Sequence, residues 1–140
     1  MFFNSVDISR QTHITSLSFH CDMGNALYSS IDYSFTNKNG ECFVSIVQEG
    51  TDPDRPFVTA VDPSLEQQLL SVLTGYRVGR WNGFNKFDRR ILDGRSFTLN
   101  VRFPDGKTVS AHGYMRWPKN YFAVRDELKA IFTRLCPEKT

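Results

Sequence analysis

The chain has 140 residues, of which 40% are hydrophobic and 23% are charged, and its formal net charge is +2. This composition excludes a disordered chain, and no apolar run is long enough to cross a bilayer. The length is typical of one domain with its own hydrophobic core. We therefore expect residues 1–140 to form a single domain, in which residues 1–12 are a loosely ordered N-terminal segment.

The N-terminal half contains four segments that are predicted to be strands. Apolar and polar residues alternate in 14–23 and in 27–36, which indicates strands with one buried face. A turn signal at 37–40 (Asn-Lys-Asn-Gly) separates the second strand from a third at 41–48. Residues 57–61 are predicted to be a short strand at most.

A helix is predicted to follow directly. Asp62 supplies a capping carboxylate, and Pro63 has the backbone angle that the first turn of a helix requires. Gly75 is a natural C-terminal stop. The buried stripe of this helix is predicted to consist of Leu65, Leu69, Val72, Leu73 and Tyr76.

A β-hairpin is predicted from residues 96–103 and 107–117. Both runs alternate between apolar and polar residues, and Pro104-Asp105-Gly106 forms a three-residue loop between them. This loop length keeps the two apolar faces together, whereas a four-residue loop would mix them. The predicted pairs are Val101 with Val109, Leu99 with Ala111, Asn100 with Ser110, Thr98 with His112, and Arg102 with Thr108.

A second helix is predicted to close the chain. Pro118 ends the second strand of the hairpin, Asn120 is predicted to cap the helix, and Pro137 cannot continue it. The apolar stripe is Tyr121, Val124, Leu128, Ile131, Phe132 and Leu135. The fold prediction is therefore α+β: a mainly antiparallel sheet of about five or six strands with two amphipathic helices packed on it.

Residues 77–95 differ from the rest of the chain in charge. They contain six basic and two acidic residues, so this stretch carries a formal charge of +4. Guanidinium groups beside aromatic rings are suited to an anionic ligand that carries a flat ring, such as a nucleotide. The competing interpretation is that the rings close the edge of the core while the basic side chains are solvated. The candidate ligand-binding residues are Arg80, Trp81, Phe84, Lys86, Arg89, Arg90, His112 and Tyr114.

The sequence contains no motif for nucleophilic catalysis, metal binding or a phosphate-binding loop, so no catalytic residue, metal or cofactor is predicted. The leading hypothesis is a non-catalytic binding or interaction module. One alternative is a protein that sequesters an anionic, nucleotide-like ligand. Another is an enzyme whose site is assembled only by folding, with His112, Cys21 and Asp22 as its candidates. A pI near 8.5 argues against nucleic acid. A homo-oligomer is left open.

The cysteines and the N-terminal residues bear on the compartment. Cys21, Cys42 and Cys136 are an odd, widely spaced set, which favours reduced thiols in the cytoplasm. Residues 1–3 are followed by polar residues, so a signal peptide is not expected. Export with a leader that is absent from this sequence is the alternative.

Several short strings carry a resemblance. They are Trp81-Asn82-Gly83-Phe84-Asn85-Lys86, Leu92-Asp93-Gly94, Phe97-Thr98-Leu99, Phe103-Pro104-Asp105-Gly106-Lys107, Ala111-His112-Gly113 and Pro118-Lys119-Asn120-Tyr121. In this order, the region from about 65 to 135 resembles a group of small, uncharacterised bacterial proteins, some of them lipoproteins. The resemblance implies an α+β fold and a bacterial origin, and it implies no activity. Residues 87–91 depart from the group, where a more polar loop is expected.

Overall fold

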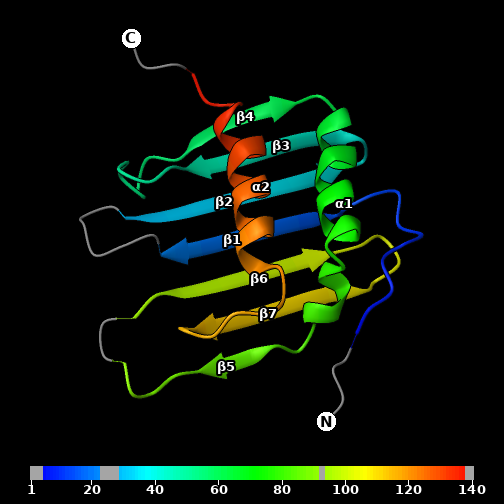
Figure 1. The fold of residues 1–140 in the computed structure, drawn as a ribbon. Coiled ribbons are helices and arrows are strands. Elements are labelled where there is room, and N and C mark those ends of the chain that lie inside the picture. Colours follow the sequence, from blue (N-terminus) through cyan, green and yellow to red (C-terminus); the bar gives the residue numbers. More distant parts are fainter. Residues whose placement is uncertain (1–4, 23–28, 92–93, 138–140) are drawn as a thin grey trace.

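The structure, a computed structural model, describes residues 5–22, 29–91 and 94–137. It is an α+β fold in which the sheet has the strand order β4-β3-β2-β1-β6-β7-β5 (Figure 1). The elements are β1 (Ser16–Asp22), β2 (Ser30–Lys38), β3 (Glu41–Val47), β4 (Phe57–Val61), α1 (Ser64–Gly75), the 3-10 helix η1 (Val78–Trp81), β5 (Asn85–Phe87), β6 (Ser96–Arg102), β7 (Thr108–Tyr114) and α2 (Tyr121–Thr133). Within the described ranges, no helix is long and apolar enough to cross a membrane.

The sheet confirms the predicted class and adds a strand that the sequence did not indicate. Neighbouring strands are antiparallel except for β5, which runs parallel to β7. β5 has only three residues, too few to show an alternating pattern, and it lies inside the basic stretch 77–95. Met23, residues 27–28 of the predicted second strand, and Leu92-Asp93 lie outside the described residues.

The hairpin of β6 and β7 has the predicted register. Val101 lies opposite Val109, Leu99 opposite Ala111 and Thr98 opposite His112. The loop is closed by two backbone hydrogen bonds, from the Phe103 amide to the Lys107 carbonyl and from the Gly106 amide to the Phe103 carbonyl. Gly106 has a φ of +90°, which explains why glycine stands at this position.

The prediction that the second strand of the hairpin continues to Trp117 is wrong. β7 ends at Tyr114, and Met115 adopts a left-handed backbone with φ of +56°. The chain then folds back, so that the Arg116 carbonyl lies where a side chain on Gly113 would stand. This reversal directs residues 115–120 away from the sheet edge and towards α2.

The two helices begin differently. The Asp62 carboxylate accepts a hydrogen bond from the Ser64 amide at 2.8 Å at the start of α1, as predicted. The predicted cap of α2 by Asn120 is wrong, because Asn120 has a left-handed φ of +68° whereas a capping residue is normally extended. Its side chain instead donates to the Tyr76 carbonyl at 3.5 Å.

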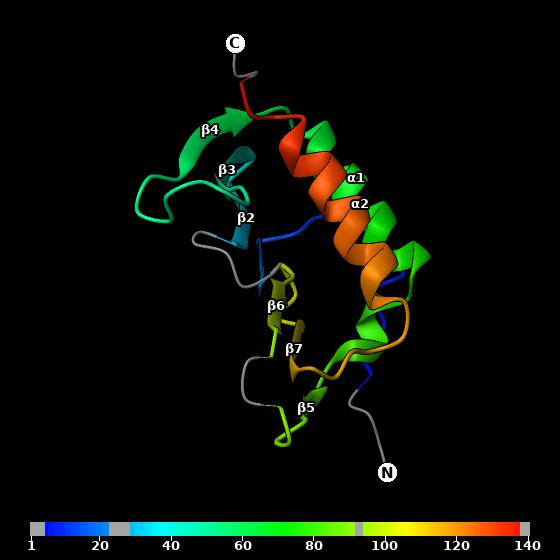
Figure 2. The same cartoon turned by 60° about the vertical axis from the view of Figure 1, so that its left-hand side comes forward.

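Both helices pack on one face of the sheet and leave the opposite face without a covering helix (Figures 1 and 2). The core lies between the sheet and the helices, and it contains the apolar side chains of β1, β2, β3, β6 and β7 and the predicted stripe of α2 from Tyr121 to Phe132. Leu135, the last residue of the predicted stripe, follows the end of α2 and is only partly buried. Part of the N-terminal segment, predicted to be loosely ordered, also contacts this core. Ile8 is buried, and the Val6 amide donates to the Gly79 carbonyl.

Candidate functional site

The uncovered face of the sheet carries a row of polar side chains across four strands. Asp32 of β2 lies opposite His20 of β1, His20 opposite Thr98 of β6, and Thr98 opposite His112 of β7. His112 Nδ1 is 2.9 Å from Thr98 Oγ1. The row results from the register of the strands, which places side by side residues that are far apart in sequence.

The candidates of the enzyme hypothesis do not come together in this row. The carboxylates of Asp22 and Asp32 lie 3.6 and 3.5 Å from the ring nitrogens of His20, and His112 contacts Thr98 and the ring of Phe87 instead. Cys21 is buried on the opposite, helix-covered face, where desolvation raises the pKa of its thiol to about 11. The thiol is therefore protonated near neutral pH, and a reactive thiolate is not formed.

A shallow hollow lies beside His112, where β5 meets β7. Its volume is about 370 Å³, and it is lined by Gly83, Phe84, Asn85, Thr98, Asn100, Ser110, Ala111 and His112. Polar groups of the lining are already hydrogen-bonded: the Ser110 hydroxyl donates to the Asn100 side chain at 2.6 Å, and the Ser110 amide donates to the side chain of Asn82, which lies outside the lining. The lining contains no arginine or lysine, so nothing in it favours an anion.

The basic residues of stretch 77–95 are dispersed. Arg77 and Arg80 line a hollow of about 320 Å³ against residues 5–9, next to the C-terminal end of α1. Arg89 and Arg90 follow β5 and are exposed. Arg90 already binds the Asp88 carboxylate through two hydrogen bonds of 3.0 and 3.1 Å. The predicted single patch is thus divided between distant places.

Two of the rings predicted to bind a ligand are part of the core. Trp81 is buried, and its Nε1 donates to the Lys119 carbonyl at 3.0 Å. Phe84 packs against Phe97, and the Lys86 ammonium lies 5.5 Å from the Phe84 ring. These contacts favour the interpretation that the rings of the basic stretch close the edge of the core.

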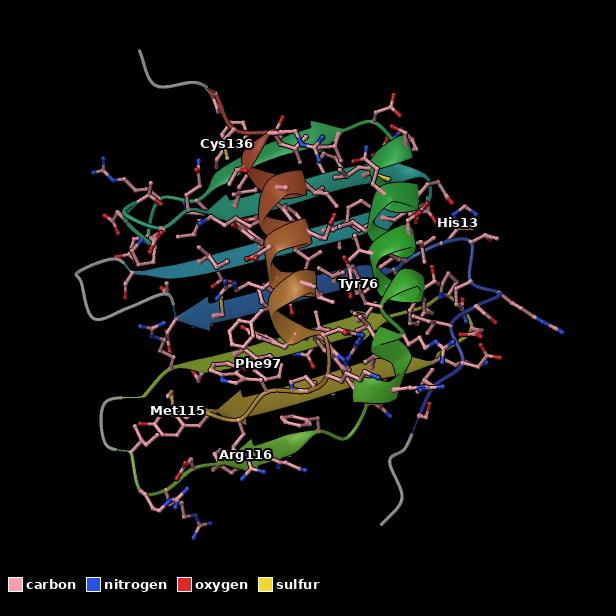
Figure 3. All side chains as sticks on the ribbon, in the orientation of Figure 1. His13, Tyr76, Phe97, Met115, Arg116 and Cys136 are labelled. Atoms are coloured by element: carbon pink, nitrogen blue, oxygen red, sulfur yellow. The ribbon has the colours of Figure 1, made fainter. Side chains whose placement is uncertain are left out.

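Tyr114 fixes the segment between β5 and β6. Its hydroxyl donates to the Ile91 carbonyl at 2.8 Å and accepts from the Gly94 amide at 2.7 Å. The phenol thus ties together the two described ends of this segment. As a result, Arg95 is set beside the chain that leaves β7, where Figure 3 labels Met115 and Arg116.

A third hollow combines arginine and aromatic side chains at this end of the sheet. Its volume is about 370 Å³, and it is lined by Asp22, Arg95, Met115, Trp117, Tyr121, Phe122 and Arg125. The residues come from the end of β1, the position directly before β6, the segment after β7 and the first turns of α2. Of the hollows described, it is the one in which arginines and partly exposed rings meet.

The rings of this hollow form a layered group. Trp117 is stacked on Tyr121, with 4.7 Å between the ring centroids and 24° between the planes. Phe122 meets Tyr121 edge to face at 5.1 Å, and 49% of Phe122 is exposed. The Arg125 guanidinium lies 5.1 Å from the Phe122 ring. An exposed ring beside a cation is a stacking surface for a flat, electron-rich group.

The charges of the hollow are two guanidinium groups and one engaged carboxylate. Asp22 Oδ2 accepts from the amide and the hydroxyl of Ser96 at 3.2 and 3.0 Å. Arg125 pairs with Asp126 at 3.0 Å, whereas Arg95 forms no ion pair within the described parts of the chain. Among the described residues, a ligand anion that binds Arg95 therefore displaces no ion-pair partner.

Sequence reasoning missed most of this hollow. Only Arg95 belongs to the basic stretch, and Trp117 was assigned to a strand that ends before it. One signal was available: Phe122 and Arg125 lie three residues apart on the helix, outside its apolar stripe, and therefore share a face. The approach of that face to Arg95 depends on how α2 crosses the sheet.

Comparison with known proteins gives no assignment. No protein-family model matches this sequence, and no curated protein sequence matches it significantly. The resemblance to small bacterial proteins therefore stays a prediction.

Proposed function

We propose that this protein is a non-catalytic binding domain for a small anionic ligand that carries a flat ring, with a nucleotide-like compound as the type. The observation that carries the proposal is the hollow in which Arg95 and Arg125 meet Trp117, Tyr121 and Phe122. The proposal keeps the chemistry expected from the basic stretch and moves the site to its C-terminal end.

Arginine is suited to the anionic part of such a ligand. Its planar guanidinium can bind two oxygens of a phosphate or carboxylate at once, and charge-assisted hydrogen bonds are stronger than neutral ones. Arg95 is exposed and directly precedes β6, whereas Arg125 lies on α2, and both line the hollow. We expect the two guanidinium groups to bind the anionic group of the ligand from two separate segments of the chain.

The rings and the carboxylate would select the rest of the ligand. Phe122 offers an exposed face, and Trp117 is half-buried on the same wall. Stacking on such faces tolerates many flat rings, because every one of them has a π surface. Asp22 retains acceptor capacity beyond its bonds to Ser96, which favours a ring that carries an N–H donor.

A cytoplasmic location is part of the proposal. The three cysteines, Cys21, Cys42 and Cys136, form no disulfide in the structure, which agrees with a reducing compartment.

Calorimetry with matched ligands tests the proposed function. We expect a nucleoside monophosphate to bind more tightly than the neutral nucleoside or a sugar phosphate, because only the first has both the ring and the anion. Arg95→Ala and Arg125→Ala should each weaken binding on the order of tenfold or more, and added salt should weaken it further. Phe122→Ala should weaken binding of the nucleotide but not binding of the sugar phosphate.

The matched control is Arg102→Ala. Arg102 is an exposed arginine at the opposite end of β6, so its loss removes the same charge at a distance from the hollow. If Arg102→Ala weakened ligand binding as much as Arg95→Ala, the net charge of the protein would explain the loss of affinity, and the proposed site would be contradicted. Binding of the neutral nucleoside as tight as that of the nucleotide would contradict the ligand class.

A further inference from the structure

β4 is an edge strand of the sheet. It pairs with β3 on one side, and no strand of the described chain pairs with its other side, as the top of Figure 1 shows. Edge strands usually carry a lysine, a proline or a bulge that prevents pairing with another chain. The sequence of β4, Phe-Val-Thr-Ala-Val, has neither lysine nor proline, and its register against β3 is continuous.

The burial of β4 is incomplete on both faces. On the helix-covered face, Phe57 and Val61 contact the core but are only partly buried. On the open face, Val58 is 62% exposed. Beside it, Phe43, which lies opposite Ala60, is 40% exposed. The apolar surface therefore continues to the sheet edge and would be completed by another strand.

We propose that a second copy of this chain docks on this edge, with the two β4 strands antiparallel and related by a two-fold axis at Thr59. Val58 then lies opposite Ala60 of the partner subunit, and Phe57 lies opposite Val61 of the partner subunit. Apolar side chains face each other on both sides of the sheet, and the half-buried Phe57 and Val61 become covered. β4 is therefore self-complementary when it pairs with an antiparallel copy of itself, as an isologous contact requires.

The residues that flank β4 support a second copy over another partner. Arg55 precedes the strand and Asp62 follows it, and neither forms an ion pair with another described residue of the same chain. In the antiparallel pairing, Arg55 comes within one position of Asp62 of the partner subunit. The two-fold axis repeats this contact at the other end, so opposite charges meet twice.

Light scattering coupled to size-exclusion chromatography tests the dimer. The wild-type chain should elute with twice the 16.1 kDa of one chain, and Val58→Lys should elute as a monomer. Val58 is largely exposed, so the charge is tolerated by the monomer fold, which circular dichroism checks. Ser18→Lys adds the same charge to the open face of the central strand β1 and should leave the dimer intact. A wild-type monomer at all concentrations up to about 1 mM, or a dimer of Val58→Lys, would overturn the proposal.

A cysteine scan tests the register. Thr59 is the only residue of β4 that faces itself across the axis, so Thr59→Cys should form an intermolecular disulfide on mild oxidation. Directly opposed residues are close enough for such a bond, whereas diagonal ones are not. Val58→Cys is the matched control, and both variants are made with Cys136→Ser, because Cys136 is the partly exposed native thiol. Cross-linking of Val58→Cys as fast as that of Thr59→Cys would overturn the proposed pairing.

Discussion

Glu66 shows how one residue ties distant segments together. Its side chain is 3% exposed on α1, and it accepts hydrogen bonds from the Ile14 amide at 2.8 Å and the Asn37 side chain at 2.9 Å. His13 Nδ1 lies 3.0 Å from the other oxygen. The carboxylate thus links the N-terminal segment, the end of β2 and α1. Its burial is compensated by donors, as a buried charge requires.

Glu66→Gln is expected to destabilise the fold by about 1–3 kcal/mol near neutral pH, because a carboxylate that accepts from three donors becomes an amide with one acceptor oxygen. Desolvation raises the pKa of Glu66, but the bonds from Ile14, Asn37 and His13 outweigh it, so the pKa is lowered overall. A lowered pKa gives stability that is present above the unfolded-state pKa and is lost as the pH falls through the folded-state pKa. Urea unfolding of wild type and Glu66→Gln, from pH 7 to acidic pH, measures the difference in their unfolding free energies.

The difference in unfolding free energy between wild type and Glu66→Gln should therefore become smaller as the pH is lowered. Glu127→Gln is the control, because Glu127 is an exposed glutamate on α2. A gap that is constant over the acidic range would contradict the role of the charged carboxylate.

Among the elements, the buried face of α2 was predicted well because its information is local, although the cap of the helix was not. The stripe of Tyr121, Val124, Leu128 and Phe132 is buried as expected, and its period is visible within thirteen residues. The hairpin was equally predictable, since loop length and alternation fix its register. In contrast, the end of β7 at Tyr114 depends on a chain reversal over Gly113. The apolar alternation continues to Trp117 and therefore did not indicate this reversal.

Leu128→Ala is expected to cost on the order of 2–5 kcal/mol of unfolding free energy, the usual range for a leucine removed from a packed core. Leu128 is completely buried at the middle of α2, where the helix covers the sheet. Chemical denaturation measures the loss. Glu127→Ala, one residue away but exposed, should change stability by less than about 0.5 kcal/mol. A similar small loss for Leu128→Ala would contradict the assigned helix face.

At the scale of the whole molecule, the sequence predicted the fold class better than the candidate site. Strand and helix periods specify the layers, so the α+β class followed from residue patterns. The hollow at Arg95 and Arg125 forms only because α2 lies near the end of β1 and the start of β6. This arrangement depends on packing between segments that are far apart in sequence, which local residue patterns do not specify. The net charge of residues 77–95 indicated a place for an anion, but it did not indicate which of the arginines would lie beside exposed rings in a hollow.

The central claim is that the arginine and aromatic hollow binds an anionic, flat ligand, and nitrogen-15 NMR of the side chains tests it most directly. Titration with a nucleoside monophosphate should shift the Nε signals of Arg95 and Arg125 and the Nε1 signal of Trp117 along one saturable curve. The Nε signal of Arg102 and the Nε1 signal of the buried Trp81 should not follow that curve. Saturable shifts confined to Arg89 and Arg90, or no saturable shift at all, would contradict the account.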